Sequence, residues 1–122
     1  MKILVQSLLL LQALAAPLEF ADALKLADKN EVSLEAGVKA ALVQSQDAAL
    51  HAAMANCVAL APGRLPAFTI VLKLDASGHS LQSWRNNDLP IVRCAERELR
   101  NGAYKTNGQD DFYTSFVVSF TP

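Results

Sequence analysis

Apolar and polar residues alternate in two runs near the end of the chain. These runs, 68–74 (FTIVLKL) and 112–120 (FYTSFVVSF), place their apolar side chains mainly on one face. Alternation with a period of two is typical of half-buried β-strands. The first run leads into 75–78 (DASG), which predicts a hairpin turn in which Gly78 takes a positive φ. A weaker second strand is expected over 79–85.

A charged helix is predicted between the second and third strands, over 89–101. Pro90 suits its first turn, and Gly102 is a natural C-terminal stop. A helical crossover after a hairpin returns the third strand beside the first, antiparallel to it. The predicted fold is therefore α+β: a ββαβ unit with a three-stranded antiparallel sheet in the order 2-1-3. Its third strand lies at an edge, where a partner's strand could be added.

Helical spacing dominates the chain before this sheet. Apolar residues recur every three residues within 17–30, and a long alanine-rich segment from Leu34 to Leu60 follows. Ser33 is the expected N-cap of that long helix. These patterns divide the chain into a helical arm over 16–63 and a sheet domain over 64–122.

The first 15 residues have the pattern of a secretory signal peptide. A lysine precedes an apolar run, and Ala13-Leu14-Ala15 forms a cleavage site, so we expect a periplasmic or secreted protein. The apolar run is shorter than the roughly 20 residues of a membrane span, and we expect no membrane span in the chain that remains after cleavage. Cleavage leaves 107 of the 122 residues, with 10 basic against 12 acidic side chains. That balance gives no electrostatic argument for nucleic acid as a partner.

Cys57 and Cys94 are predicted to form a disulfide. An even number of cysteines in an exported chain favours a bridge, and a loop of 37 residues gives it a stabilising effect of about 3 to 4 kcal/mol. The spacing contains no C-x-x-C motif, and the two histidines form no ligand pattern with the cysteines. We therefore expect neither a metal nor a cofactor.

The residues of a hydrolytic triad occur together in the hairpin. Asp75, Ser77 and His79 alternate within one turn, where they cannot be arranged as nucleophile, base and orienting acid, so turn chemistry is the better explanation. The charged residues of 93–100 are interpreted as a solvated helix face in which Glu96 pairs with Arg100. No reaction is predicted.

Four residues are candidates for contact with a partner. Trp84, Tyr113 and Val117 share the sheet face opposite the crossover helix, and Tyr104 lies in the loop after that helix. Aromatic anchors of this kind are common in protein interfaces. The alternative for Trp84 is packing against the alanine-rich N-terminal helix.

The strand FTIVLKLD, the turn DASG, the helix IVRCAERELRNG followed by Ala103-Tyr104, and a last strand ending VVSF resemble the C-terminal domain of the TonB family. The likeness includes small TonB-like domains that carry a cysteine pair, and it covers about half of the chain. Tyr104 matches the family's aromatic position, whereas Thr106 stands where a proline is expected. Residues 16–66 lack the proline-rich span of the energy transducers. The resemblance thus implies a stand-alone periplasmic protein-binding module.

Two other functions remain open at this point. An immunity-type inhibitor of an exported toxin would insert a loop such as 104–111 into the toxin's cleft. A small hydrolase would have to use the hairpin residues already described.

Overall fold

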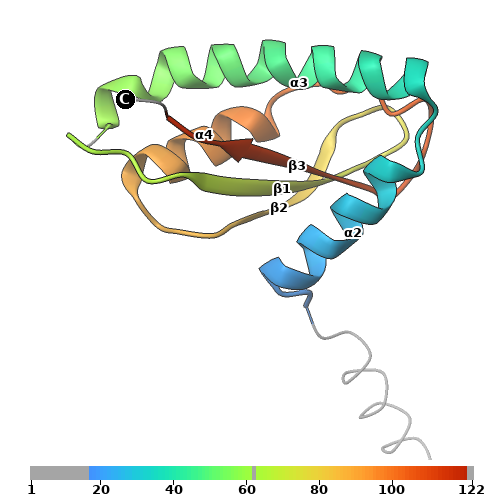
Figure 1. Ribbon diagram of the computed structural model, residues 1–122, viewed down its shortest axis with the longest axis horizontal. Helices are drawn as coiled ribbons and strands as arrows, with labels where there is room; N and C mark the ends of the chain where they lie inside the picture. The colour runs from blue at the N-terminus through green and yellow to red at the C-terminus, as the bar shows by residue number, and fades with distance from the viewer. Residues whose placement is uncertain (1–16, 62, 121–122) are drawn as a thin grey trace, which may run out of the picture.

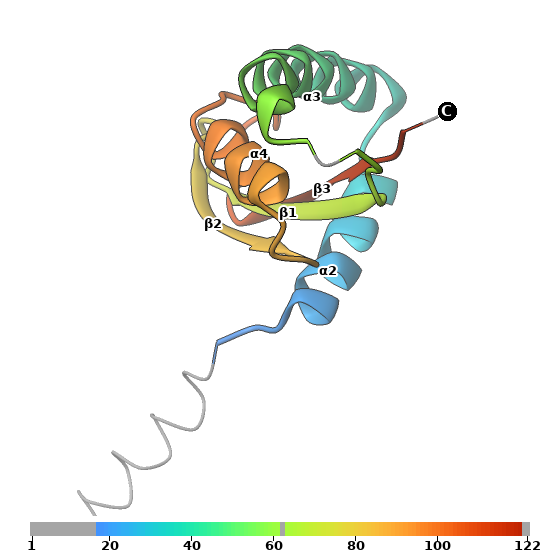
Figure 2. The same ribbon diagram turned by 90° about the vertical axis from the view of Figure 1, so that its left-hand side faces the viewer.

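The computed structural model describes residues 17–61 and 63–120, which form three layers (Figures 1 and 2). Two helices cover one face of a sheet, and a third helix covers the other face. In chain order the elements are α2 (Phe20–Val32), α3 (Ala36–Cys57), the 3-10 helix η1 (Val58–Leu60), β1 (Phe68–Leu74), β2 (Ser80–Arg85), α4 (Pro90–Arg100) and β3 (Phe112–Val118). The expected signal peptide lies outside the described residues.

The sheet confirms the predicted fold class and strand order. Its three strands run in the order β2-β1-β3, and β1 is antiparallel to both neighbours. Phe68 pairs with Val118 and Ile70 with Phe116, so the large apolar residues of β1 and β3 share one face. The pairing of β1 with β2 shifts at Lys73, close to the hairpin.

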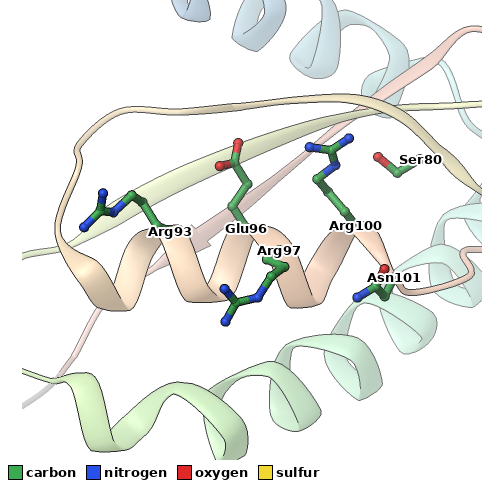
Figure 3. A pocket seen from close by; sticks show the side chains of 6 residues that line it. All are labelled: Ser80, Arg93, Glu96, Arg97, Arg100 and Asn101. Atoms are coloured by element: carbon green, nitrogen blue, oxygen red, sulfur yellow. The ribbon is translucent and has the colours of Figure 1, made fainter.

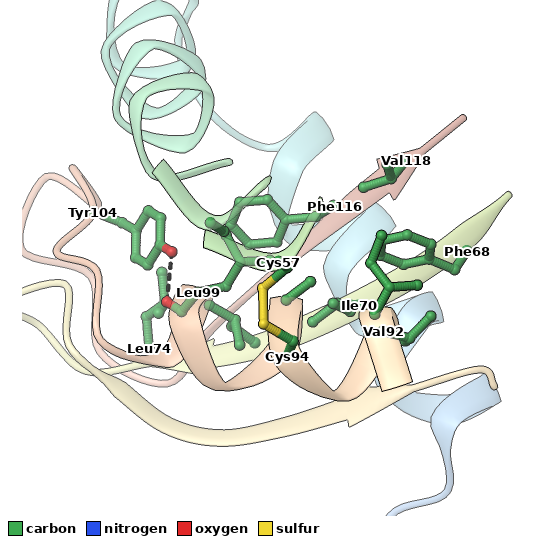
Figure 4. Packing of buried hydrophobic residues seen from close by; sticks show 14 of the residues in the cluster. Cys57, Phe68, Ile70, Leu74, Val92, Cys94, Leu99, Tyr104, Phe116 and Val118 are labelled. Carbon is green, nitrogen blue, oxygen red and sulfur yellow. Dashed lines mark hydrogen bonds between the residues drawn. A yellow bond between two sulfur atoms is a disulfide. The ribbon is translucent and has the colours of Figure 1, made fainter. Parts of the chain in front are cut away.

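The main core lies between this apolar face and the helices α3 and α4 (Figure 4). Ile91, Val92, Ala95 and Leu99 of α4 are buried in this cluster, and Leu42 and Ala53 of α3 pack into it. The helical arm and the sheet domain therefore contribute to one core. The buried core residues include Phe68, Ile70, Leu72, Leu74, Ile91, Val92, Ala95, Leu99, Phe112 and Phe116.

The predicted disulfide is present. Cys57 at the end of α3 is bonded to Cys94 of α4, with the two Cα atoms 5.7 Å apart (Figure 4). The bridge ties the two helices together on the same face of the sheet. Because it closes a 37-residue separation, it removes unfolded-state freedom equivalent to about 3 to 4 kcal/mol.

A smaller cluster lies on the opposite face, beneath α2. Ala23 and Ala27 pack against Val71 and Tyr113, and the half-buried Trp84 lies beside them. The small alanine side chains allow the helix to approach the sheet closely. The helix that covers Trp84 is thus α2, not the long alanine-rich helix. The long helix α3 lies on the other face, where Cys57 is bonded to Cys94 of α4 and Leu42 and Ala53 pack into the main core.

The junction between α2 and α3 differs from the expected capping. Ser33 follows the end of α2, where its hydroxyl donates to the Asn30 carbonyl oxygen at 2.7 Å. The residue before α3 is Glu35, and its side chain makes no capping hydrogen bond. Over the described ranges, no helix is both long and apolar enough to span a bilayer.

Candidate functional site

The β3 strand is at the sheet edge, as predicted, but side chains from two helices occupy much of its outward backbone. Tyr113 N–H donates to Asn30 Oδ1 at 2.8 Å, and the Ser115 carbonyl accepts from Gln46 Nε2 at 3.4 Å. The Ser115 main-chain N–H also lies close enough to the Glu31 carboxylate to lower its pKa. The expectation that the last strand is open to strand addition is therefore wrong from Tyr113 to Ser115.

A buried hydrogen-bond network reinforces this closure. Gln46 Nε2 donates to Thr114 Oγ1 at 2.7 Å, and Thr114 Oγ1 donates to Glu31 Oε2 at 3.0 Å. Ser115 Oγ lies 3.3 Å from the second Glu31 oxygen. Burial raises the pKa of the Glu31 carboxyl above its ordinary value of 4.5, although the hydrogen bonds from Thr114 and Ser115 oppose the shift.

The β2 strand forms the other edge of the sheet, and there the backbone is open. The Asn86 N–H donates to the Thr69 carbonyl oxygen. The backbone N–H and C=O groups of alternate β2 residues, such as Trp84, therefore point toward β1, and those of the residues between them point away from the sheet. Ser83 and Arg85 are two such outward positions. Within the described residues, no hydrogen bond joins their outward backbone groups to another element.

The α4 face beside this edge is organised differently from the predicted solvated helix. Glu96 is only 9% exposed. Its carboxylate accepts from Arg85 Nη1 at 2.6 Å and from Ser83 Oγ at 2.9 Å, instead of pairing with Arg100. Glu96 therefore anchors β2 to α4, and the predicted Glu96–Arg100 pair is wrong. The two acidic partners Glu96 and Asp88 together raise the pKa of Arg85.

Trp84 and Tyr113, two of the predicted contact residues, pack against other parts of this molecule. Trp84 Nε1 donates to the Leu18 carbonyl oxygen at 3.0 Å, and its ring lies 5.8 Å from that of Tyr113. Tyr113 is 9% exposed because α2 covers it. Val117, on the same face, is 70% exposed and remains available.

Tyr104 is in the core, not on the surface. It is 3% exposed, and its hydroxyl donates to the Leu99 carbonyl oxygen at 2.6 Å (Figure 4). Burial strongly raises the pKa of its phenol. The ring also packs edge-on against Phe116. The expectation that Tyr104 contacts a partner is therefore wrong, because the residue is buried. Tyr104 instead attaches the loop after α4 to the core.

The hairpin residues do meet, but in an order that differs from a hydrolytic triad. Ser77 Oγ donates to Asp75 Oδ1 at 2.8 Å and lies 3.1 Å from His79 Nδ1. The serine thus stands between the acid and the imidazole, whereas a triad places the histidine in the middle. Asp75 also accepts from the main-chain N–H groups of Ser77 and His79, and these hydrogen bonds lower its pKa. The arrangement is that of a turn stabilised by its aspartate.

Sequence reasoning missed the residues that distinguish the two edges. Asn30, Glu31 and Gln46 are polar residues on helices, and nothing in their spacing indicates that they meet β3. Glu96 was visible only as part of a charged run. The alternating pattern of β2 could have shown that Ser83 and Arg85 share a face, but not that α4 lies over them. Across the described chain, no group of three His, Cys, Asp or Glu side chains is placed to bind a metal.

Comparison with known proteins gives no further guide, because no family model, no curated protein and no solved structure matches this chain.

Proposed function

We propose that this chain is an exported, non-enzymatic protein-binding module, similar in role to a stand-alone TonB C-terminal domain. It binds an extended segment of a protein partner by strand addition. The observation that carries the proposal is the asymmetry of the sheet. Helix side chains form hydrogen bonds with the outward backbone of β3, whereas the outward backbone groups of Ser83 and Arg85 in β2 have no hydrogen-bond partner among the described residues. The binding edge is thus β2, in place of the last strand.

Export is supported by the disulfide and by the signal-peptide pattern. Disulfides form and persist in oxidising compartments such as the periplasm or the exterior of the cell. The Cys57–Cys94 bridge lies inside the main core, where it contributes to the stability of the whole domain.

A backbone unpaired in this way is a binding surface of known type. Strand addition supplies main-chain hydrogen bonds, while alternate side chains of the added segment provide specificity. The pairing of β1 with β2 shifts between Lys73 and Leu74, opposite the start of β2. The usable edge is therefore the regular part of β2, from Gln82 to Arg85. The proposal therefore concerns a short segment of a few residues.

Immunity to a toxin remains the alternative proposal. Its contact would be the loop after α4, but Tyr104 and Thr106 of that loop are buried. Lys105 and the tip from Asn107 to Asp111 are exposed for insertion into a cleft. The β2 edge offers more backbone for recognition, so strand addition is the better-supported mechanism.

A pair of proline variants tests the proposed edge. Proline removes one N–H without breaking the ladder when that N–H points outward. We expect Ser83→Pro to abolish capture of the native partner from an extract of the producing cells. Val117→Pro, which makes the same change at an outward position of β3, should leave capture intact.

The reverse pattern, loss with Val117→Pro alone, would return the binding edge to β3. Capture that survives both changes would exclude strand addition. Because Ser83→Pro also removes the hydrogen bond to Glu96, a photo-crosslinking residue at Gln82, compared with one at Val117, gives the same comparison with the outward N–H intact. An adduct with the captured partner is expected only from position 82.

A further inference from the structure

A positively charged hollow lies between β2 and α4, alongside the proposed binding edge. Its volume is about 320 Å³. Arg93 and Arg100 extend from α4 on the side that faces β2, and Ser80 lies near the Arg100 end (Figure 3). Its lining residues are Ser80, Arg93, Glu96, Arg97, Arg100 and Asn101.

The arginines of this hollow carry charge that the protein itself does not neutralise. Glu96 is the one carboxylate in the lining, and Arg85 and Ser83 already occupy its two oxygens. Among the ion pairs of the described residues, none includes Arg93, Arg97 or Arg100. The hollow therefore has a local excess of positive charge, although the whole chain has a formal net charge of −1.

Ser80 supplies an independent sign that a ligand belongs here. Its Oγ is buried and is, in the part of the chain that the structure describes, the single buried side-chain oxygen or nitrogen without a hydrogen-bond partner. A buried hydroxyl left unpaired costs about 1 to 3 kcal/mol. Arginine has donors only, so none of the three guanidinium groups can accept the Ser80 proton. A ligand oxygen with negative charge satisfies the hydroxyl and the guanidinium groups together.

From these observations we infer that the segment added to β2 is acidic, with carboxylates that bind in the hollow at Arg93, Arg100 and Ser80. This inference rests on the proposed strand addition at β2. The geometry suits an extended chain, because α4 returns alongside β2 and places Arg93 near one end of the hollow and Arg100 near the other (Figure 3).

The spacing of the two arginines agrees with such a segment. They are seven residues apart, which corresponds to about 10 Å along a helix. Carboxylates two or four residues apart on one face of a strand are separated by about 7 or 13 Å, within reach of the flexible arginine side chains. The hollow thus recognises acidic residues at alternate positions of the added segment. The unpaired outward backbone groups of Ser83 and Arg85 bind the backbone of the same segment.

Peptide titrations followed by NMR on the mature, disulfide-bonded protein test this inference. The probe is a peptide of about ten residues in which glutamate alternates with valine, and its control has glutamine for every glutamate. We expect the glutamate peptide to shift the amide signals of Ser80, Ser83 and Arg85. Its affinity should fall when salt is raised from about 50 to 500 mM.

Charge variants identify the groups responsible. Arg93→Gln combined with Arg100→Gln should weaken the glutamate peptide by about 100-fold, or roughly tenfold per arginine. Lys25→Gln combined with Lys39→Gln makes the same charge change on α2 and α3, away from the hollow, and should have little effect. Equal weakening by both pairs would mean that only the overall charge matters, which would overturn the inference.

The remaining outcomes separate this inference from the proposed function. Equal binding of the glutamine peptide would overturn the acidic specificity and leave strand addition standing. Inorganic phosphate is a third probe: if it shifts Ser80 while neither peptide shifts Ser83 or Arg85, the hollow is a free-anion site and the inference fails. If neither peptide binds, the inference fails as well. The Ser83→Pro capture experiment then decides the proposed function separately.

Discussion

Gly78 links the β-hairpin to the loop after α4 through a contact that leaves no room for a side chain. Its φ is +85°, and its carbonyl oxygen accepts from Tyr104 N–H at 3.0 Å. A Cβ at this position would overlap the Tyr104 carbonyl group. The positive φ could be predicted from the turn sequence. The contact with Tyr104 could not, because it joins residues that are distant in sequence.

Replacing Gly78 should therefore cost more than the turn conformation alone. We expect Gly78→Ala to lower the free energy of unfolding by about 2 to 4 kcal/mol, because the left-handed backbone and the overlap with a rigid main chain both contribute. Gly108→Ala is the matched control, since Gly108 also has a positive φ of 75° but no heavy atom within 4 Å of an added Cβ. Its cost should be about 1 kcal/mol.

Urea denaturation of the three proteins measures these differences. Equal destabilisation by the two substitutions would mean that Tyr104 does not approach the hairpin as closely as the structure indicates.

Glu96 shows a second limit of prediction at the residue scale. A charged residue between arginines on an amphipathic helix favours a pair within the helix. The structure instead turns Glu96 toward Arg85 and Ser83 of β2. The choice depends on which strand lies against the helix, and a helix's own sequence does not contain that information.

At the scale of elements, the strands and the crossover helix follow directly from the sequence. Alternation located β1 and β3, and the order hairpin, helix, strand placed α4 as the crossover between β2 and β3. The predicted Cys57–Cys94 bond places α3 beside α4. The position of α2 over the opposite face did not follow, because no comparable link in the sequence ties that helix to the sheet.

The C-terminal end of α2 closes the β3 edge with a carboxylate whose pKa is raised by burial. A raised pKa means that the folded state binds this proton more tightly than the unfolded state. The contribution of protonated Glu31 to the stability of the folded protein is therefore complete at pH values below 4.5, its ordinary pKa. This contribution is lost as pH rises through the higher pKa of the folded state. Glu31→Gln removes this dependence while keeping an acceptor oxygen for Thr114.

The stability of wild type relative to Glu31→Gln should therefore fall as pH rises from below 4.5 through the raised pKa of Glu31. Denaturation midpoints of both proteins over this pH range give the comparison. A relative stability of wild type that rises with pH would show that the hydrogen bonds from Thr114 and Ser115 outweigh the burial of the charge.

At the scale of the whole molecule, the three layers protect one sheet edge and leave the other open. Helices α2 and α3 both supply side chains to β3, whereas the hydrogen bonds between β2 and α4, over the described residues, come from the side chains of Ser83 and Arg85. The fold and strand order could be predicted because handedness and strand direction restrict the topology. Which edge is open could not be predicted, since it depends on three polar side chains whose partners are more than 60 residues away.

Hydrogen exchange of individual backbone amides in the free protein, measured by NMR, tests this asymmetry most directly. The outward amide of Tyr113 is hydrogen-bonded to Asn30, and that of Ser115 lies close to the Glu31 carboxylate. Both should therefore exchange at least about tenfold more slowly than those of Ser83 and Arg85. The outward amide of Val117 should exchange as fast as those of β2. Protection at Ser83 and Arg85 equal to or greater than that at Tyr113 and Ser115 would contradict an open β2 edge.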